Sequence, residues 1–177
     1  PLNIFEERYL DMVDYSLSKD RIVGMIQYKP NNEIYNVGCY GKITVFNETP
    51  DKRYFINLEG KSCFKIVREV NSEYKFRMCE IEALNDYNNN NLKDKLKIDL
   101  IKHYKKYNEI KNINLNLEEV SNLNIVDLLK FIVMVSPFET NIKQMCLELE
   151  SNTELYENVL STLKIELASV EQISSIN

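Results

Sequence analysis

The chain has 177 residues, of which 44% are hydrophobic and 28% charged, the balance of a globular protein. No apolar run approaches the roughly 18 residues that a membrane-spanning helix needs. The first residues show no signal-peptide pattern, so we expect a cytoplasmic protein without a membrane partner.

The first predicted element is an amphipathic helix over residues 4–18, with Asn3 as its N-cap and Glu6 three residues later. Its apolar positions recur at helical spacing and are Phe5, Tyr9, Met12, Val13 and Leu17. Residues 22–28 predict a strand, in which Gly24 indicates a bulge or a close approach of another group to the backbone.

Further strands follow in a β-rich region. Residues 39–46 alternate with the period of two that is typical of a strand. Residues 54–58 alternate next and end at Glu59-Gly60, and the runs 63–70 and 74–81 form another pair. Short strands joined by tight turns favour an antiparallel sheet curled towards a small barrel.

The rest of the chain is predicted to be helical. An Asn-rich stretch at 85–91 has the composition of an exposed linker. After it, apolar side chains at helical spacing predict helices near 92–107, 125–133, 138–149 and 155–170. We therefore expect an α+β fold with a β part at 1–84, a linker at 85–91 and a helical bundle at 92–177. We expect the two halves to unfold as one unit, because a barrel of this size is marginal alone.

The residues needed for metal, nucleotide or catalytic chemistry are missing. The four cysteines are far apart in the sequence and form no C-x-x-C pair, so we expect no metal site. We interpret them as reduced thiols, and a disulfide is the alternative. Gly60-Lys61-Ser62 is the tail of a P-loop pattern, but Phe55 occupies the position of its first glycine, so no cofactor is expected. No G-x-S-x-G motif occurs, and a catalytic triad would depend on His103 in a lysine-rich segment. These absences predict a protein that is not an enzyme.

The helix at 92–111 is basic, and Tyr104 and Tyr107 lie among Lys102, Lys105 and Lys106. Such a helix is one basis for nucleic-acid binding. The tyrosines fall on the apolar stripe, however, and the chain has a net charge of −5, which weakens attraction to phosphates. A nucleic-acid partner is therefore only the alternative hypothesis.

Several motifs resemble those of the N-terminal substrate-binding domain of Lon proteases, and they occur in the same order and with the same spacing as in that family. Pro1–Val13 is similar to the family's P-L-x-I-F-E-x-R-Y segment, and Asp20–Ile26 to the strand that follows it. Val37–Ile43 resembles V-G-x-x-G-x-I, and Tyr54–Gly60 with Phe64–Ile66 resembles R-Y-x-x-x-L-x-G-x-x-R-F-x-I.

The resemblance continues at Lys143–Glu148, which is similar to K-Q-x-L-L-E, and at 155–163 in the terminal helix. The chain departs from the family at Glu7, where Pro is common, and at Cys63, where Arg is common. The family also has a strand containing F-P-L ahead of the first motif, and we expect a trimmed chain that lacks it.

The resemblance implies a bacterial-type, PUA-like β pseudobarrel followed by a helical bundle. It implies binding of unfolded or partly unfolded polypeptides, with a protease or another protein as a further partner. Full-length Lon proteases add an ATPase and a peptidase domain, which these 177 residues do not contain, so we expect recognition without proteolysis.

Seven residues are candidates for polypeptide contact: Glu6, Arg8, Tyr9, Met25, Tyr40, Phe46 and Met78. Adaptable apolar side chains suit variable clients, although each apolar candidate has ordinary core packing as its alternative. Arg8 has two alternatives as well. Its guanidinium either binds a peptide carboxylate, or it pairs with a local acid and fixes the first helix.

Overall fold

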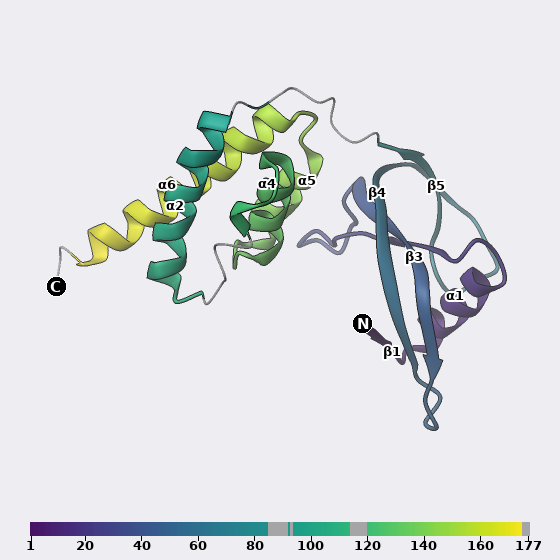
Figure 1. Ribbon diagram of the computed structural model, residues 1–177. Coiled ribbons are helices and arrows are strands. Elements are labelled where there is room, and N and C mark those ends of the chain that lie inside the picture. Colours follow the sequence, from purple (N-terminus) through teal and green to yellow (C-terminus); the bar gives the residue numbers. More distant parts are fainter. Residues whose placement is uncertain (85–91, 93, 114–119, 175–177) are drawn as a thin grey trace. The chain divides into compact units, whose positions relative to one another are not determined.

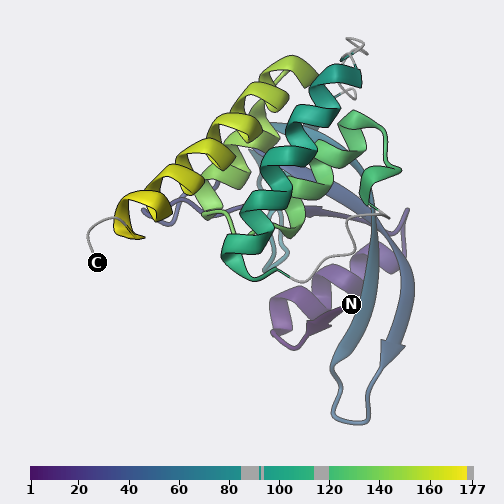
Figure 2. The same ribbon diagram turned by 60° about the vertical axis from the view of Figure 1, so that its left-hand side comes forward.

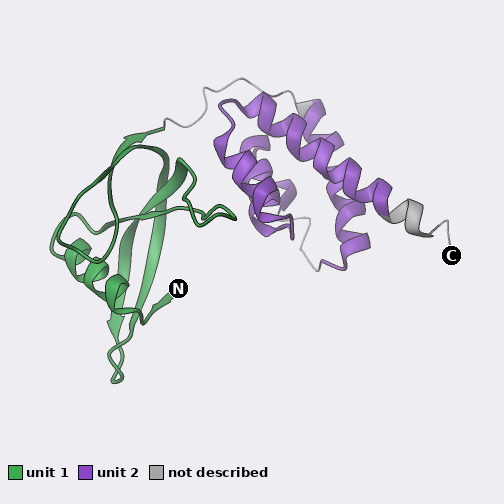
Figure 3. Cartoon of the chain, turned by 180° about the vertical axis from the view of Figure 1, so that it is seen from behind, with its two compact units in different colours: residues 1–86 green, residues 87–177 purple. Residues whose placement is uncertain are grey.

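The computed structural model describes residues 1–84, 92, 94–113 and 120–174. The chain consists of two compact units, residues 1–86 and 87–177, which are coloured separately in Figure 3. Unit 1 holds the sheet and unit 2 is helical, so the predicted α+β class is confirmed (Figure 1). The predicted linker at 85–91 lies outside the described residues, and the predicted domain bounds stay a prediction. None of the helices within the described ranges is long and apolar enough to cross a membrane.

Unit 1 is an antiparallel sheet with one helix packed on it. Its elements are β1 (Leu2–Ile4), α1 (Glu7–Leu17), β2 (Ile22–Met25), β3 (Val37–Glu48), β4 (Tyr54–Val70) and β5 (Met78–Ala83). The strand order is β1-β4-β3-β2, and β5 also pairs with β4. β1 pairs with the first residues of β4 and β5 with the last ones, so β4 holds the sheet together.

The core of unit 1 lies between α1 and the sheet. Val13 of α1 is fully buried against Val23, Ile43 and Ile56, one residue from each of three strands. Figure 2 shows α1, in purple, beside the long strands β3 and β4. The other side of α1 is covered as well, because the ring of Tyr15 lies 5.7 Å from that of the buried Phe76.

The structure corrects the prediction for the first residues. Leu2–Ile4 form strand β1, opposite Tyr54–Ile56, and the helix begins only at Glu7. Asn3 is therefore in a strand and is not the N-cap, a position that Glu6 occupies without a side-chain capping bond. Pairing with β4 satisfies the backbone of these residues, so tertiary contact overrides the local capping pattern.

β4 is also longer than the sequence predicts. Glu59-Gly60 does not end a strand, since β4 continues from Tyr54 to Val70. The register passes from Gly41 opposite Gly60 to Tyr40 opposite Ser62, so Lys61 is an extra residue in a β-bulge. A bulge bends a strand without ending it. The last predicted strand likewise begins later, at Met78 rather than at residue 74.

Unit 2 is a set of helices around one apolar core. They are α2 (Asp94–Lys111), α4 (Ile125–Val135), α5 (Thr140–Glu148) and α6 (Asn152–Ser174). Its fully buried side chains include Leu100, Leu128, Leu129, Ile132, Val159 and Leu163. Asn124 caps α4 by accepting a 2.9 Å hydrogen bond from the backbone N–H of Asp127. The apolar periodicity therefore predicted these helices correctly.

Candidate functional site

Three of the seven candidate residues form one cluster at the start of α1. The Nε and one terminal nitrogen of Arg8 lie 3.0 and 2.9 Å from the same carboxylate oxygen of Glu6. The guanidinium carbon of Arg8 lies 4.5 Å from the centre of the Tyr9 ring. The carboxylate of Glu6 thus occupies one edge of the guanidinium, which is the pairing with a local acid that the sequence left open beside peptide binding. The Arg8 side chain is 47% exposed, so part of the guanidinium stays accessible beside the ring.

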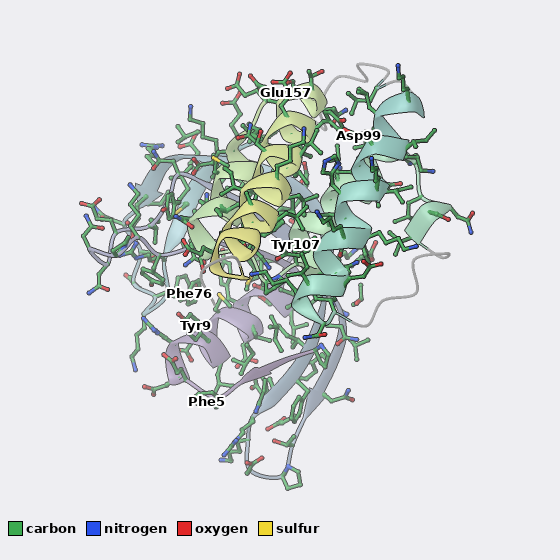
Figure 4. All side chains as sticks on the ribbon, turned by 90° about the vertical axis from the view of Figure 1, so that its left-hand side faces the viewer. Phe5, Tyr9, Phe76, Asp99, Tyr107 and Glu157 are labelled. Atoms are coloured by element: carbon green, nitrogen blue, oxygen red, sulfur yellow. The ribbon has the colours of Figure 1, made fainter. Side chains whose placement is uncertain are left out.

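Neighbouring aromatic residues extend this cluster. The side chain of Phe5 is 65% exposed, and that of Tyr28 is also exposed. The pKa of Arg8 is raised above its usual range, first by the hydrogen bond to Glu6 and then by the neighbouring phenols of Tyr9 and Tyr28. Figure 4 labels Phe5, Tyr9 and Phe76 in this part of unit 1. We call Phe5, Glu6, Arg8, Tyr9 and Tyr28 the α1 patch.

Met25 and Tyr40 lie apart, on opposite faces of the sheet. Met25 ends β2, is half exposed, and pairs with Cys39 in β3. Tyr40 follows Cys39 directly, so its side chain points to the other face. There its ring lies 6.5 Å from that of the buried Phe64.

Phe46 and Met78 differ in the same way. The ring of Phe46 meets that of Tyr54 edge-on at 4.9 Å, and Phe46 packs against the core of unit 1. Phe46 is therefore a packing residue. Met78 begins β5 opposite Val70 and is half-buried. The seven candidates thus do not form one site.

A second exposed apolar surface escaped the sequence analysis. Val67, Val70 and Ile81 are exposed along β4 and β5. Val67 has no partner in the ladder because the register shifts between Ile66 and Arg68. In the described part of the chain, β5 pairs with β4 alone, so its outer edge carries backbone groups without a strand partner. We call β5 with Val67 and Val70 the β5 edge. An alternating apolar pattern reveals a strand, but it does not reveal a bulge or an edge.

The basic helix of unit 2 forms a pocket. Lys102, His103, Lys106 and Lys164 line a cavity of about 310 Å³ together with Leu167 and Ala168. His103 donates from Nδ1 to the carbonyl oxygen of Asp99 at 2.9 Å, and a lysine-rich wall surrounds it.

The two tyrosines of this helix belong to the core. Tyr104 and Tyr107 are about 1% exposed, and Tyr107 packs against Phe138 with ring centres 5.7 Å apart. Figure 4 labels Tyr107 and Asp99 on α2. Neither tyrosine is available to stack on a base.

Within the described ranges, no group of three or more His, Cys, Asp and Glu side chains is placed to hold a metal ion.

Comparison with known proteins agrees with this architecture. Residues 1–164 match the family of the ATP-dependent protease La (LON) substrate-binding domain. A Lon N-terminal domain protein from Xanthomonas campestris is 15% identical with a TM-score of 0.67, over 90% of this chain and 86% of that one. The N-terminal domain of the Mycobacterium avium complex Lon protease is 13% identical with a TM-score of 0.65, over 92% of this chain and 89% of that one. A separate search of curated proteins gives no match. Because the family match spans most of the chain, the protein belongs to the LON substrate-binding domain family.

Proposed function

We propose that the protein binds unfolded polypeptide segments and catalyses no reaction itself. The observation that carries this proposal is the uneven distribution of exposed apolar side chains. Among the described residues, fourteen large hydrophobic side chains are exposed, and ten of them lie in unit 1. Unfolded chains differ from folded ones in exposing apolar side chains, so a surface of this kind favours them. Membership of a family of substrate-binding domains supports the same proposal.

Two surfaces of unit 1 suit an extended peptide. The β5 edge offers backbone hydrogen bonds of the kind that strand addition uses, which do not depend on the peptide's sequence. The α1 patch offers Phe5 and Tyr28 for apolar side chains and the open edge of the Arg8 guanidinium for a carboxylate. A cytoplasmic location, a PUA-like barrel and a protease partner stay predictions from the sequence.

The test uses a fluorescent, carboxymethylated polypeptide that cannot fold, with the same protein in its folded form for comparison. We expect binding of the unfolded form at about tens of micromolar or tighter, and none of the folded form. Equal affinity for the two forms, or no binding at these concentrations, contradicts the proposal.

Matched substitutions then locate the surface. Phe5→Ser removes an exposed apolar side chain from the α1 patch and Val67→Ser one from the β5 edge, while Ile165→Ser and Met134→Ser remove side chains of the same kind that are 70% exposed in unit 2. We expect the unit 1 variants to weaken binding about 3- to 10-fold, since a contact residue contributes roughly 1 kcal/mol. The unit 2 variants should leave binding unchanged. Equal effects in both units would show that the surface is wrongly placed.

Nucleic-acid binding is the second candidate, and the basic pocket of unit 2 is the observation that favours it. Its signature is RNA affinity that falls steeply as salt rises. Combined change of Lys102, Lys105 and Lys106 to Gln should abolish such binding. The charge-matched control changes three exposed lysines of unit 1 to Gln, namely Lys19, Lys42 and Lys65. The buried tyrosines remove base stacking from this mechanism, so we rank it below polypeptide binding.

A further inference from the structure

Two cysteines face each other across the central strands of unit 1. Cys39 of β3 lies directly opposite Cys63 of β4 in the ladder, between the pairs Gly38–Phe64 and Tyr40–Ser62. Their sulfur atoms are 3.7 Å apart. Figure 1 shows β3 and β4 as two long strands that lie side by side. The fold thus brings together two thiols that are 24 positions apart in the sequence.

This geometry is close to that of a disulfide. Directly opposed residues of antiparallel strands have Cα atoms about 4.5–5.5 Å apart, which lies within the range of about 4.4–6.8 Å found for disulfides. An S–S bond is about 2.05 Å long, so each sulfur needs to move by only about 0.8 Å. Small rotations of the two side chains supply this movement, and the strands can keep their register.

The other two cysteines are not placed to compete. Cys79 lies in β5 opposite Glu69, six residues along β4 from Cys63. At about 3.3 Å per residue, that separation is about 20 Å, far beyond the reach of a disulfide. Cys146 belongs to α5 of unit 2, where it is buried in the core of that unit. Oxidation of the folded unit 1 should therefore join Cys39 to Cys63.

In the structure the two side chains are thiols and no bond joins their sulfur atoms. The hydrogen bond between the thiols, followed by burial, raises the pKa of Cys39 well above its ordinary value. Both side chains are only half-buried, so a small oxidant can reach them, although a raised pKa makes the thiolate scarce and the reaction slow.

We propose that Cys39 and Cys63 form a redox-active pair that hydrogen peroxide oxidises to an intrachain disulfide, which joins β3 covalently to β4. One thiolate attacks a peroxide oxygen, the O–O bond breaks, and a sulfenic acid and hydroxide form. The second thiol attacks the sulfenic sulfur, the S–S bond forms, and the sulfenic oxygen leaves as water after taking up a proton. The proton of the first thiol neutralises the hydroxide, so two thiols and one peroxide give one disulfide and two waters. Two electrons pass from sulfur to the peroxide oxygens.

The bond would restrain the sheet where Cys39 also pairs with Met25, an exposed residue at the end of β2. It would also limit the freedom of the unfolded chain between the two cysteines. We expect the oxidised protein to melt roughly 5–15 °C higher than the reduced one. This inference does not depend on which ligand the protein binds.

The experiment treats the whole folded chain with hydrogen peroxide and digests it with trypsin without reduction. The four cysteines fall in separate tryptic peptides, 22–42, 62–65, 78–93 and 144–164. We expect peptide 22–42 to appear linked to 62–65, with the loss of two hydrogen atoms in mass and of two titratable thiols per chain. Reduction should reverse both changes.

Variants and alternative products make the result decisive. Cys39→Ser and Cys63→Ser should each abolish the linked peptide and the rise in melting temperature, whereas the control Cys79→Ser should retain both. Linkage through Cys79 or Cys146, a disulfide between two chains, or sulfinic acid at Cys39 and Cys63 without a linked peptide would each overturn the proposal. The peptide map of the unsubstituted protein decides the question even if a serine variant fails to fold.

Discussion

At the residue scale, Phe5 and Phe64 show how little residue type says about a role. Both were apolar positions in strongly patterned segments, yet Phe5 is 65% exposed and Phe64 is 4% exposed. Phe5 was expected on the buried stripe of the first helix. It instead lies between β1 and α1, outside both elements, where the helical period does not apply. Burial therefore depends on where an element begins.

This contrast gives a stability prediction. Phe64→Ala should lower the free energy of unfolding by about 3–5 kcal/mol, because it removes a buried ring and leaves a cavity. Phe5→Ala should change it by no more than about 0.5 kcal/mol, as expected for an exposed side chain. Urea unfolding followed by circular dichroism measures both values. A large loss in Phe5→Ala would mean that Phe5 packs in solution.

Tyr107 provides a pH prediction at the same scale. Burial, and then the nearby Glu166 and Tyr104, raise the pKa of Tyr107 to about 12 from its ordinary value of 10.0. Below pH 10 the phenol is protonated in both states and its contribution to stability is complete. Between pH 10 and 12 the unfolded chain loses this proton first, so stability falls as pH rises.

The measurement compares the protein with Tyr107→Phe, which lacks the titrating group. Between pH 9 and 12, we expect the unsubstituted protein to lose about 2–3 kcal/mol more of its free energy of unfolding than Tyr107→Phe does. Equal pH dependence of the two proteins would show that Tyr107 titrates normally in the folded state.

At the element scale, glycines decide how closely β2, β3 and β4 pack. A Cβ atom on Gly38 would lie 3.0 Å from the Phe64 ring and only 2.5 Å from the carbonyl oxygen of Met25, well inside van der Waals contact. At Gly60, in the same sheet, a Cβ atom would meet no atom within 4 Å. The predicted close approach at Gly24 is confirmed too, since its Cβ would lie 3.3 Å from the same ring.

Gly38→Ala and Gly60→Ala are therefore a matched pair. Gly38→Ala should cost about 1–3 kcal/mol or more, because a backbone oxygen cannot turn aside as a side chain can. Gly60→Ala should be neutral or stabilise by up to about 1 kcal/mol, since glycine costs more conformational entropy than alanine. Thermal unfolding of both variants compares them directly. Similar melting temperatures would contradict the crowding at Gly38.

At the scale of the whole molecule, the two units have separate cores of unequal size. Fourteen buried residues form the core of unit 2, and four form that of unit 1 in the described part of the chain. A small core leaves a unit marginally stable, because little apolar surface offsets the entropy of folding. The sequence-based prediction that the two halves unfold together remains to be tested.

Limited proteolysis in residues 85–91, followed by size-exclusion chromatography, provides that test. We expect the released fragment 1–84 to lose cooperative unfolding, while the whole chain shows one transition. Thermal unfolding monitored by circular dichroism of the whole chain and of each fragment measures this. Two fragments that elute apart, each with its own cooperative transition, would show that the units fold independently.

The sequence by itself determined the fold class, most helices of unit 2, the burial of Tyr104 and Tyr107, and the family resemblance. These features depend on local periodicity and on ordered motifs, which the chain carries whatever its partners are. Only the tertiary structure decided that residues 2–4 form a strand, that β4 continues through a bulge at Lys61, and that Cys39 faces Cys63. The same holds for the α1 patch and the β5 edge. Each depends on which segments pair across the sheet, and pairing between residues far apart in sequence leaves no local pattern to read.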